Sequence, residues 1–244
     1  MTVQSVVREV CSFVGVRPPN GSIFLTSQQD RTAWEFVQLA NEMVQRIAYD
    51  TRDWQLLRKR CAFIGNGTQA SFPLPPDYQR MLLTSEVWRS SNTNAPMSFV
   101  SDPDDWLRKE LQGYISPMGE WILEGGEMHI RPVLIADETA QFYYLRNTPV
   151  KLNSGGFGTQ FLNDADTCVF PERLLKLALI WQWKANKGAT YAEDLANYED
   201  ALAKVAGADK PSPVLVGTQP MSSDANIAYW GPVPGAGTFV GPGV

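Results

Sequence analysis

The spacing of apolar residues at the start of the chain predicts helices. Residues 2–15 place valines at helical intervals, and a glycine followed by two prolines ends this pattern. A longer helical region follows over residues 26–60, where Ser27 or Asp30 can accept hydrogen bonds at the first turn. We therefore expect residues 1–60 to form the N-terminal helices of a bundle.

The last part of this region is expected to be a short helix. Asp53 can cap its start, and Arg58-Lys59-Arg60 would close it, since cations are favoured at the end of a helix. A contact with phosphate is the alternative interpretation of the three cations.

The period changes to two after Arg60, which predicts strands. Asn66-Gly67 is a strong hairpin signal, and Gly125-Gly126 marks a second hairpin within "GEWILEGGEMHIRPV". Between them, residues 102–112 begin with Asp-Pro and end at a glycine, as an inserted helix does. We expect residues 61–152 to form an antiparallel, sandwich-like β-module that contains this helix and a strand in "QRMLLTSEVWRS".

The chain returns to helix after a polar, glycine-rich loop at 153–168. The stretch "FPERLLKLALIWQWKANKG" is apolar nearly all round, which indicates deep burial. Thr190 and Glu193 have the spacing of a capping box, and a narrow apolar seam follows them. Residues 153–207 are therefore predicted to hold the loop and the C-terminal helices of the bundle.

The final 37 residues, 208–244, contain 12 glycines or prolines and form no periodic pattern. Fixing a residue costs about 1–2 kcal/mol of backbone entropy, so an arm of this composition needs the contacts of another protein to become ordered. We expect the arm to be disordered in an isolated subunit; the alternative interpretation is that it folds back on the body of its own subunit. The residues predicted to contact a partner are its large apolar ones: Ile227, Tyr229, Trp230, Val233, Phe239 and Val240.

These segments together predict an α+β fold. Helices from the two ends of the chain form a bundle, an antiparallel β-module is inserted between them, and a long extended C-terminal arm follows. Apolar residues make up 44% of the chain, enough for a sizeable core.

The charge distribution argues against tight binding of nucleic acid. The formal net charge is −5, and no stripe of basic residues is present. A mildly acidic surface suits DNA that must pass without sticking. The three widely spaced cysteines give neither a metal pattern nor a disulfide framework, which favours simple burial in a reducing compartment. No signal peptide or membrane span is expected, so we predict synthesis in the cytoplasm.

Candidate catalytic and metal-binding residues are few. His129 stands alone on an expected strand, where a structural role is more common than a catalytic one. Asp164 and Asp166 could touch a cation, although a solvated turn is the simpler interpretation. Glu124 and Glu127 could act as an acid/base pair, but they flank a predicted turn. We therefore expect no enzymatic activity, no cofactor and no metal.

The tryptophans are the remaining signal, because aromatic side chains fill cores and also concentrate at interfaces. Trp181 and Trp183 lie in the apolar helix and are expected in the core. Spacing does not decide between core and interface for Trp54, Trp88, Trp106 and Trp121.

Four stretches occur in an order that resembles a known family. They are "RDWQLLRKRCAF", "QASFPLPPDYQRMLLTSEVW", "QFYYLRNTPV" and "FPERLLKLALIWQW". The chain resembles, over roughly residues 25–205, the head-to-tail adaptor proteins of short-tailed bacteriophages, of the tail tubular protein A or tail accessory factor type. The long Gly/Pro-rich arm departs from that pattern.

The resemblance implies a structural protein of the virion. Its copies would form a ring, usually of twelve, beneath the portal protein. The ring would pass double-stranded DNA without binding it specifically and would offer a docking surface to the next tail or nozzle protein. Two alternatives are a phage cell-wall hydrolase and a β-module that binds a glycan or receptor through exposed tryptophans.

Overall fold

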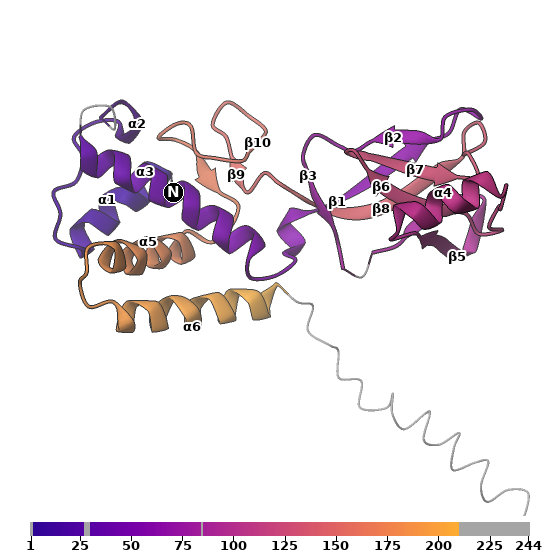
Figure 1. Ribbon diagram of the computed structural model, residues 1–244. Helices are drawn as coiled ribbons and strands as arrows, with labels where there is room; N and C mark the ends of the chain where they lie inside the picture. Colours follow the sequence, from indigo (N-terminus) through magenta and orange to yellow (C-terminus); the bar gives the residue numbers. More distant parts are fainter. Residues whose placement is uncertain (1, 27–29, 84, 210–244) are drawn as a thin grey trace, which may run out of the picture. The chain divides into compact units, whose positions relative to one another are not determined.

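Helices from both ends of the described chain pack together, and a β-module is inserted between them (Figure 1). This computed structural model of the protein describes residues 2–26, 30–83 and 85–209. The predicted α+β class is confirmed for these residues, and the predicted arm lies outside them from residue 210 onward. The helices of the bundle are α1 (Val3–Phe13), α2 (Ile23–Thr26), α3 (Arg31–Tyr49), α5 (Glu172–Asn186) and α6 (Ala192–Ala208).

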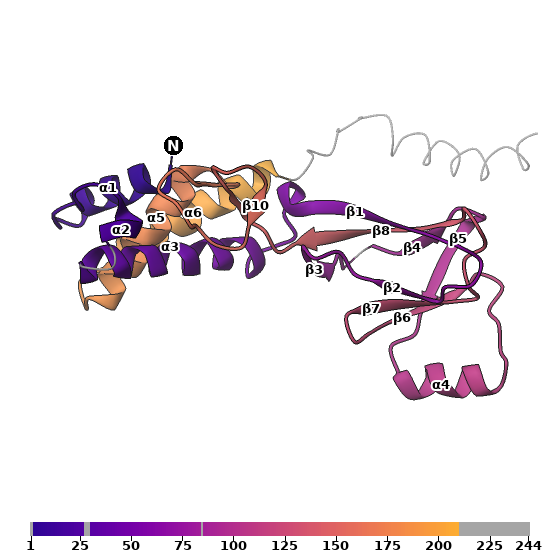
Figure 2. The same cartoon turned by 90° about the horizontal axis from the view of Figure 1, so that it is seen from above.

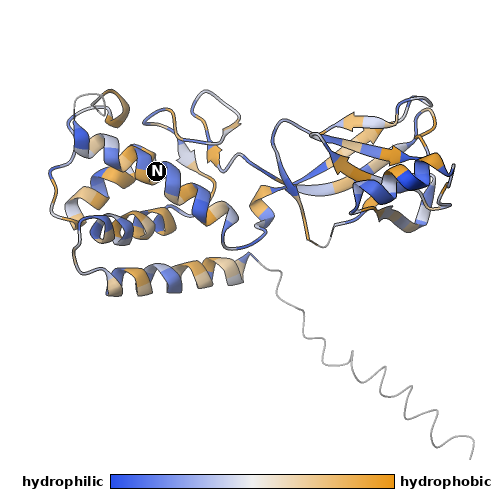
Figure 3. Ribbon diagram, in the orientation of Figure 1, coloured by the Kyte–Doolittle hydropathy of each residue, from blue (hydrophilic) through white to orange (hydrophobic). Residues whose placement is uncertain are grey.

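Helix α5 is the centre of the bundle, because it contacts α1, α3 and α6. Its contacts on several sides explain why its sequence is apolar nearly all round. The ring of Trp183 in α5 stacks on Phe36 of α3, with centroids 4.0 Å apart. Helices α1, α3 and α6 each carry hydrophilic as well as hydrophobic residues (Figure 3), as expected for helices with one face toward solvent.

The ends of the bundle helices follow local capping rules in part. Asp30 is the N-cap of α3 and accepts a hydrogen bond from the Thr32 amide at 2.9 Å. It is one of the two residues that the sequence predicted as alternatives for this cap. The capping box predicted at Thr190 and Glu193 is wrong, since α6 begins after Tyr191 without a side-chain cap. The start of α6 is held instead by an ion pair of Asp194 with Lys184, at 2.6 Å.

The β-module contains a mixed sheet of eight strands in the order β1-β8-β4-β5-β6-β7-β2, with β3 paired to β8. Its strands are β1 (Arg58–Ile64), β2 (Ser71–Pro73), β3 (Tyr78–Met81), β4 (Val87–Arg89), β5 (Asn92–Phe99), β6 (Glu120–Glu124), β7 (Glu127–Arg131) and β8 (Thr139–Arg146). The inward side chains form a core separate from that of the bundle, with Phe63, Met128 and Phe142 among its members. A small second sheet holds β9 (Val150–Lys151), β10 (Phe157–Gly158) and β11 (Thr167–Cys168).

One strand pair corrects the expectation of a purely antiparallel module. Strands β5 and β6 run parallel, with Ser98 opposite Glu120. Helix α4 (Pro103–Leu111) lies between them in sequence and provides the crossover that a parallel pair requires. Figure 2 shows α4 on the opposite side of the β-module from β1.

The two hairpin signals have different outcomes. The hairpin at Gly125-Gly126 is confirmed, because β6 pairs with β7 and both glycines have positive φ, as a tight primed turn requires. The hairpin at Asn66-Gly67 is wrong, because β1 pairs with β8 and β2 pairs with β7. The chain after β1 bonds instead to a distant segment, through Gly67 N donating to the Leu134 carbonyl at 3.0 Å.

Two further expectations in this region are corrected. Arg58-Lys59-Arg60 opens β1 rather than closing a helix, and the helical turn before it is a 3-10 helix over Gln55–Leu57 without a side-chain cap. Leu57 and Trp54 are buried in the bundle core, so the chain becomes extended as soon as it leaves that core. The expected single strand in "QRMLLTSEVWRS" is interrupted, giving β3 and β4.

A buried ion pair joins β4 to the segment before β8. The Glu138 carboxylate accepts two hydrogen bonds from Arg89, at 2.8 and 2.7 Å, and further ones from Ser91 and from the Ile135 amide. Because these donors stabilise the charged form, with the Arg89 contact the largest, the pKa of Glu138 falls to about 2.

Acid should therefore weaken the β-module through Glu138. A carboxyl group whose pKa is lowered by folding contributes stability above its unfolded pKa, and this contribution disappears as the pH falls from about 4.5 toward about 2. We expect the loss to be about 3 kcal/mol in the free energy of unfolding, measured by urea titration at several pH values. Glu138→Gln should be less stable at neutral pH and show a flatter pH profile; an equally steep profile would contradict this assignment.

Candidate functional site

The candidate acid/base residues lie on one exposed hairpin. Glu124 and Glu127 face each other across the β6–β7 turn, and both are exposed. His129 is two residues farther along β7, where its Nδ1 lies 2.7 Å from the Ser71 hydroxyl of β2. This contact ties two paired strands together and gives the histidine a structural partner.

The interpretation of Asp166 as part of a solvated turn is wrong. Its side chain is fully buried and accepts hydrogen bonds from the amides of Asn153, Leu162 and Asn163, at 2.7 to 2.8 Å. The neighbouring Asp164 accepts from the Ile23 amide at 2.8 Å. The pair therefore organises the 153–168 loop and attaches it to the N-terminal helices, a role that spacing in sequence does not reveal.

The tryptophans divide between core and surface. Trp54, Trp121 and Trp183 are buried, whereas Trp181 is only partly buried against the bundle core. Trp106 of α4 is half-buried beneath the Arg131 guanidinium, 4.1 Å from the ring centroid. Trp88 is exposed on β4.

Exposed Trp88 belongs to a groove on the outer face of the sheet, which we call the sheet-face groove. Tyr143 of β8 and Arg60 of β1 line it with Trp88, and its volume is about 380 Å³. The described residues around Arg60 give it no ion pair. This side of β1, β4 and β8 therefore presents aromatic rings together with the charged side chains of Arg60 and Glu86.

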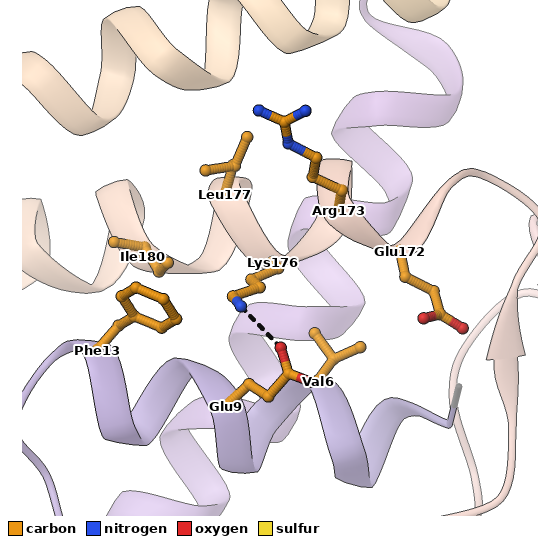
Figure 4. A pocket seen from close by; sticks show the side chains of 8 residues that line it. All are labelled: Val6, Glu9, Phe13, Glu172, Arg173, Lys176, Leu177 and Ile180. Atoms are coloured by element: carbon orange, nitrogen blue, oxygen red, sulfur yellow. Dashed lines mark hydrogen bonds and ion pairs between the residues drawn. The ribbon is translucent and has the colours of Figure 1, made fainter.

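A second groove, the α1–α5 groove, lies on the bundle and has a volume of about 420 Å³. Figure 4 shows that the Lys176–Glu9 ion pair, at 2.7 Å, crosses it between the two helices. Phe13 lies beside this pair with its ring centroid 4.3 Å from the Lys176 ammonium, and Leu177 and Ile180 complete the apolar wall. Phe13 remains 66% exposed, which is unusual for so large an apolar side chain at the edge of a packed helix.

A third surface, the α4 cluster, was missed by sequence reasoning. It consists of exposed apolar side chains on α4 and the loop after it: Leu107, Leu111, Tyr114, Ile115 and Met118. Only Leu107 and Leu111 lie within α4, and their spacing of four was a usable signal of an apolar helix face, but the same spacing is typical of a face turned to a core.

Helix α4 is held to the sheet by charges rather than by apolar packing. Glu120 accepts from Lys109 at 2.9 Å and from Arg131 at 2.7 Å. Burial alone would raise the pKa of Glu120, but these two cations lower it overall. The network leaves the leucines of α4 free to face outward, so the α4 cluster is available to another protein.

The three cysteines are free thiols, with Cys11 and Cys61 buried. Burial raises the pKa of Cys11 to about 11 and that of Cys168 to about 12, which keeps both as poorly reactive thiols.

The six arm residues predicted to contact a partner, from Ile227 to Val240, lie outside the described residues. Within the described ranges, no group of three histidine, cysteine or acidic side chains is arranged to hold a metal ion. No helix in the same ranges has the length and apolar character needed to cross a membrane.

Comparison with known proteins gives one result. The family described as SU10 adaptor protein matches residues 1–217, which is most of the chain. No curated protein matches the sequence. The family match includes the bundle, the β-module and all three exposed surfaces described above.

Proposed function

The chain belongs to the SU10 adaptor protein family of phage head-to-tail adaptors, and we propose that it forms a ring beneath the portal that continues the DNA channel. In this role its C-terminal arm grips the portal, and its folded body offers a platform to the next tail protein. The family match over residues 1–217 carries the proposal.

The exposed surfaces are consistent with a protein that works inside an assembly. The α1–α5 groove, the sheet-face groove and the α4 cluster lie on different elements of one small chain. A monomer rarely exposes so many large apolar side chains without a partner. A ring with partners above and below needs separate surfaces for its neighbours and for each partner. We assign contacts with other proteins to these three surfaces.

The net charge suits the proposed channel. A formal charge of −5 per chain gives a ring that repels DNA weakly rather than binding it, which allows DNA to slide during ejection. The family is one of structural phage adaptors, and we propose no catalytic role for Glu124, Glu127 or His129.

Electron microscopy of the purified protein mixed with its portal tests this function. We expect a ring on one end of the portal, with rotational symmetry that reports the number of copies, twelve by likeness to related adaptors. Portal particles that show no added density when this protein is present in large excess over portal would contradict the adaptor role. Binding of the protein to a glycan array under the same conditions would favour the glycan-binding alternative instead.

A further inference from the structure

Strand β1 forms one border of the eight-stranded sheet, with β8 as its neighbour on one side (Figure 2). In the described ranges, no strand pairs with it on the second side, and no backbone hydrogen bond reaches its residues, Arg58–Ile64, from there. An open edge of this kind presents unpaired N–H and C=O groups, which are a template for a strand of another molecule.

Alternate residues of β1 direct these groups outward. Arg60 lies opposite Tyr143, and Ile64 lies opposite Thr139. The N–H and C=O groups of both β8 residues point away from β1, because they bond to residues that precede or follow β4. Hydrogen-bonded and non-hydrogen-bonded pairs alternate along an antiparallel ladder, so all four even-numbered residues of β1 have backbone groups free for a further strand.

Two of these four residues are exposed cations. Neither Arg58 nor Arg60 forms an ion pair with a carboxylate in the part of the chain that the structure describes, although Glu86 lines the sheet-face groove together with Arg60. Lys59 differs from them, since its ammonium lies 2.8 Å from the Asp77 carboxylate. Opposite charges on facing strand residues attract, so the two arginines favour a strand with carboxylates at alternate positions.

The chain itself does not supply such a strand. Strand β2, at the other border of the sheet, spans only Ser71–Pro73 and has no carboxylate. A second copy of β1 would add three more cations, Arg58-Lys59-Arg60, and like charges on facing strands repel. Residues 210–244 contain a single acidic side chain, that of Asp224. The complement to this edge therefore belongs to a different protein.

We propose that the open edge of β1 binds an extended, acidic segment of another protein as an added strand. Main-chain hydrogen bonds to the even-numbered residues of β1 hold the segment, and its alternate carboxylates lie beside Arg58 and Arg60. Tyr143 and Ile64, which are 52% and 65% exposed, add apolar contact surface next to the two arginines. This binding does not depend on a ring or on the portal, so it is tested on the isolated full-length protein.

Two synthetic peptides, (Glu-Val)4 and (Lys-Val)4, test whether the edge selects acidic strands. Each is titrated into isotopically labelled protein, and the amide signals are followed by nuclear magnetic resonance. We expect (Glu-Val)4 to bind saturably, with the largest shift changes at the amides of Arg58, Arg60, Ala62 and Ile64, and (Lys-Val)4 to bind at least tenfold more weakly. Arg58→Glu combined with Arg60→Glu should reverse this preference. No binding of (Glu-Val)4, or equal binding of both peptides, would overturn the proposal.

A second measurement separates strand addition from attraction between charges alone. One form of (Glu-Val)4 is N-methylated at every glutamate and another at every valine, which removes alternate backbone donors without changing the charge. We expect at least one of the two forms to lose binding. Ala62→Pro should also lose it while the circular dichroism spectrum is retained, because the N–H of Ala62 points away from β8. Unchanged binding by both methylated forms would overturn the proposal, as would a dimer of the protein that Ala62→Pro abolishes, since the edge would then bind a second copy.

Discussion

Removal of residues 225–244 is expected to abolish stable attachment to the portal while the folded body keeps its stability. The arm has large apolar side chains, and burial of each contributes about 2 kcal/mol, a factor of about 30 in affinity. Several copies in one ring bind the portal at the same time, so the loss of affinity per copy multiplies across the assembly. Co-sedimentation of the truncated protein with portal, compared with the full chain, measures this effect.

A full-length variant distinguishes the effect of the arm's apolar side chains on portal binding from the effect of the arm's length. Serine in place of the six residues Ile227, Tyr229, Trp230, Val233, Phe239 and Val240 should bind as poorly as the truncation. As a matched control, alanine at the polar positions Gln219, Ser222 and Ser223 should bind like the unaltered protein. If the truncated protein binds portal with an affinity within threefold of the full chain, the arm does not contribute to attachment. If a ring still assembles on the portal, the adaptor role itself stands.

The second large effect is expected from Asp166→Ala, which should lower the free energy of unfolding by at least about 3 kcal/mol. The carboxylate satisfies the amides of Asn153, Leu162 and Asn163, and the carbonyl of Asp166 accepts from the Val3 amide at 2.8 Å. Alanine would leave the three amides of the loop without their acceptor in a site that excludes water. Urea unfolding followed by far-ultraviolet circular dichroism reports the loss.

Glu199→Ala is the matched control for that experiment. Glu199 is an exposed carboxylate on α6, so its removal should change the free energy of unfolding by no more than about 0.5 kcal/mol. An Asp166→Ala protein as stable as the Glu199→Ala protein would mean that the loop does not depend on this carboxylate.

Two carboxylates hold segments of the chain against the folded body. Asp166 fixes the irregular backbone of the 153–168 loop, and Glu120 fixes the short helix α4. Leu107 and Leu111 of α4 remain on the surface. This division of roles makes the α4 cluster the part of the β-module best placed to contact another protein.

Sequence alone was sufficient for features that depend on neighbouring residues. The helical period gave α1, α3, α5 and α6, and two adjacent glycines gave the β6–β7 hairpin. The order of four short stretches indicated the adaptor family, which the match over residues 1–217 confirms. Each of these signals is carried by spacing or turn chemistry within one segment.

The tertiary structure alone decided which distant segments meet. Asn66-Gly67 turns the chain as its residues favour, but the partner of β1 is β8, about 80 positions away, so no hairpin forms. The folded loop likewise brings the amides of Asn153, Leu162 and Asn163 to the Asp166 carboxylate. The folded body leaves Leu107 and Leu111 of α4 exposed. Local preferences select a backbone conformation. Burial and strand pairing depend on residues far away in the chain, so the spacing of residues along the sequence does not predict them.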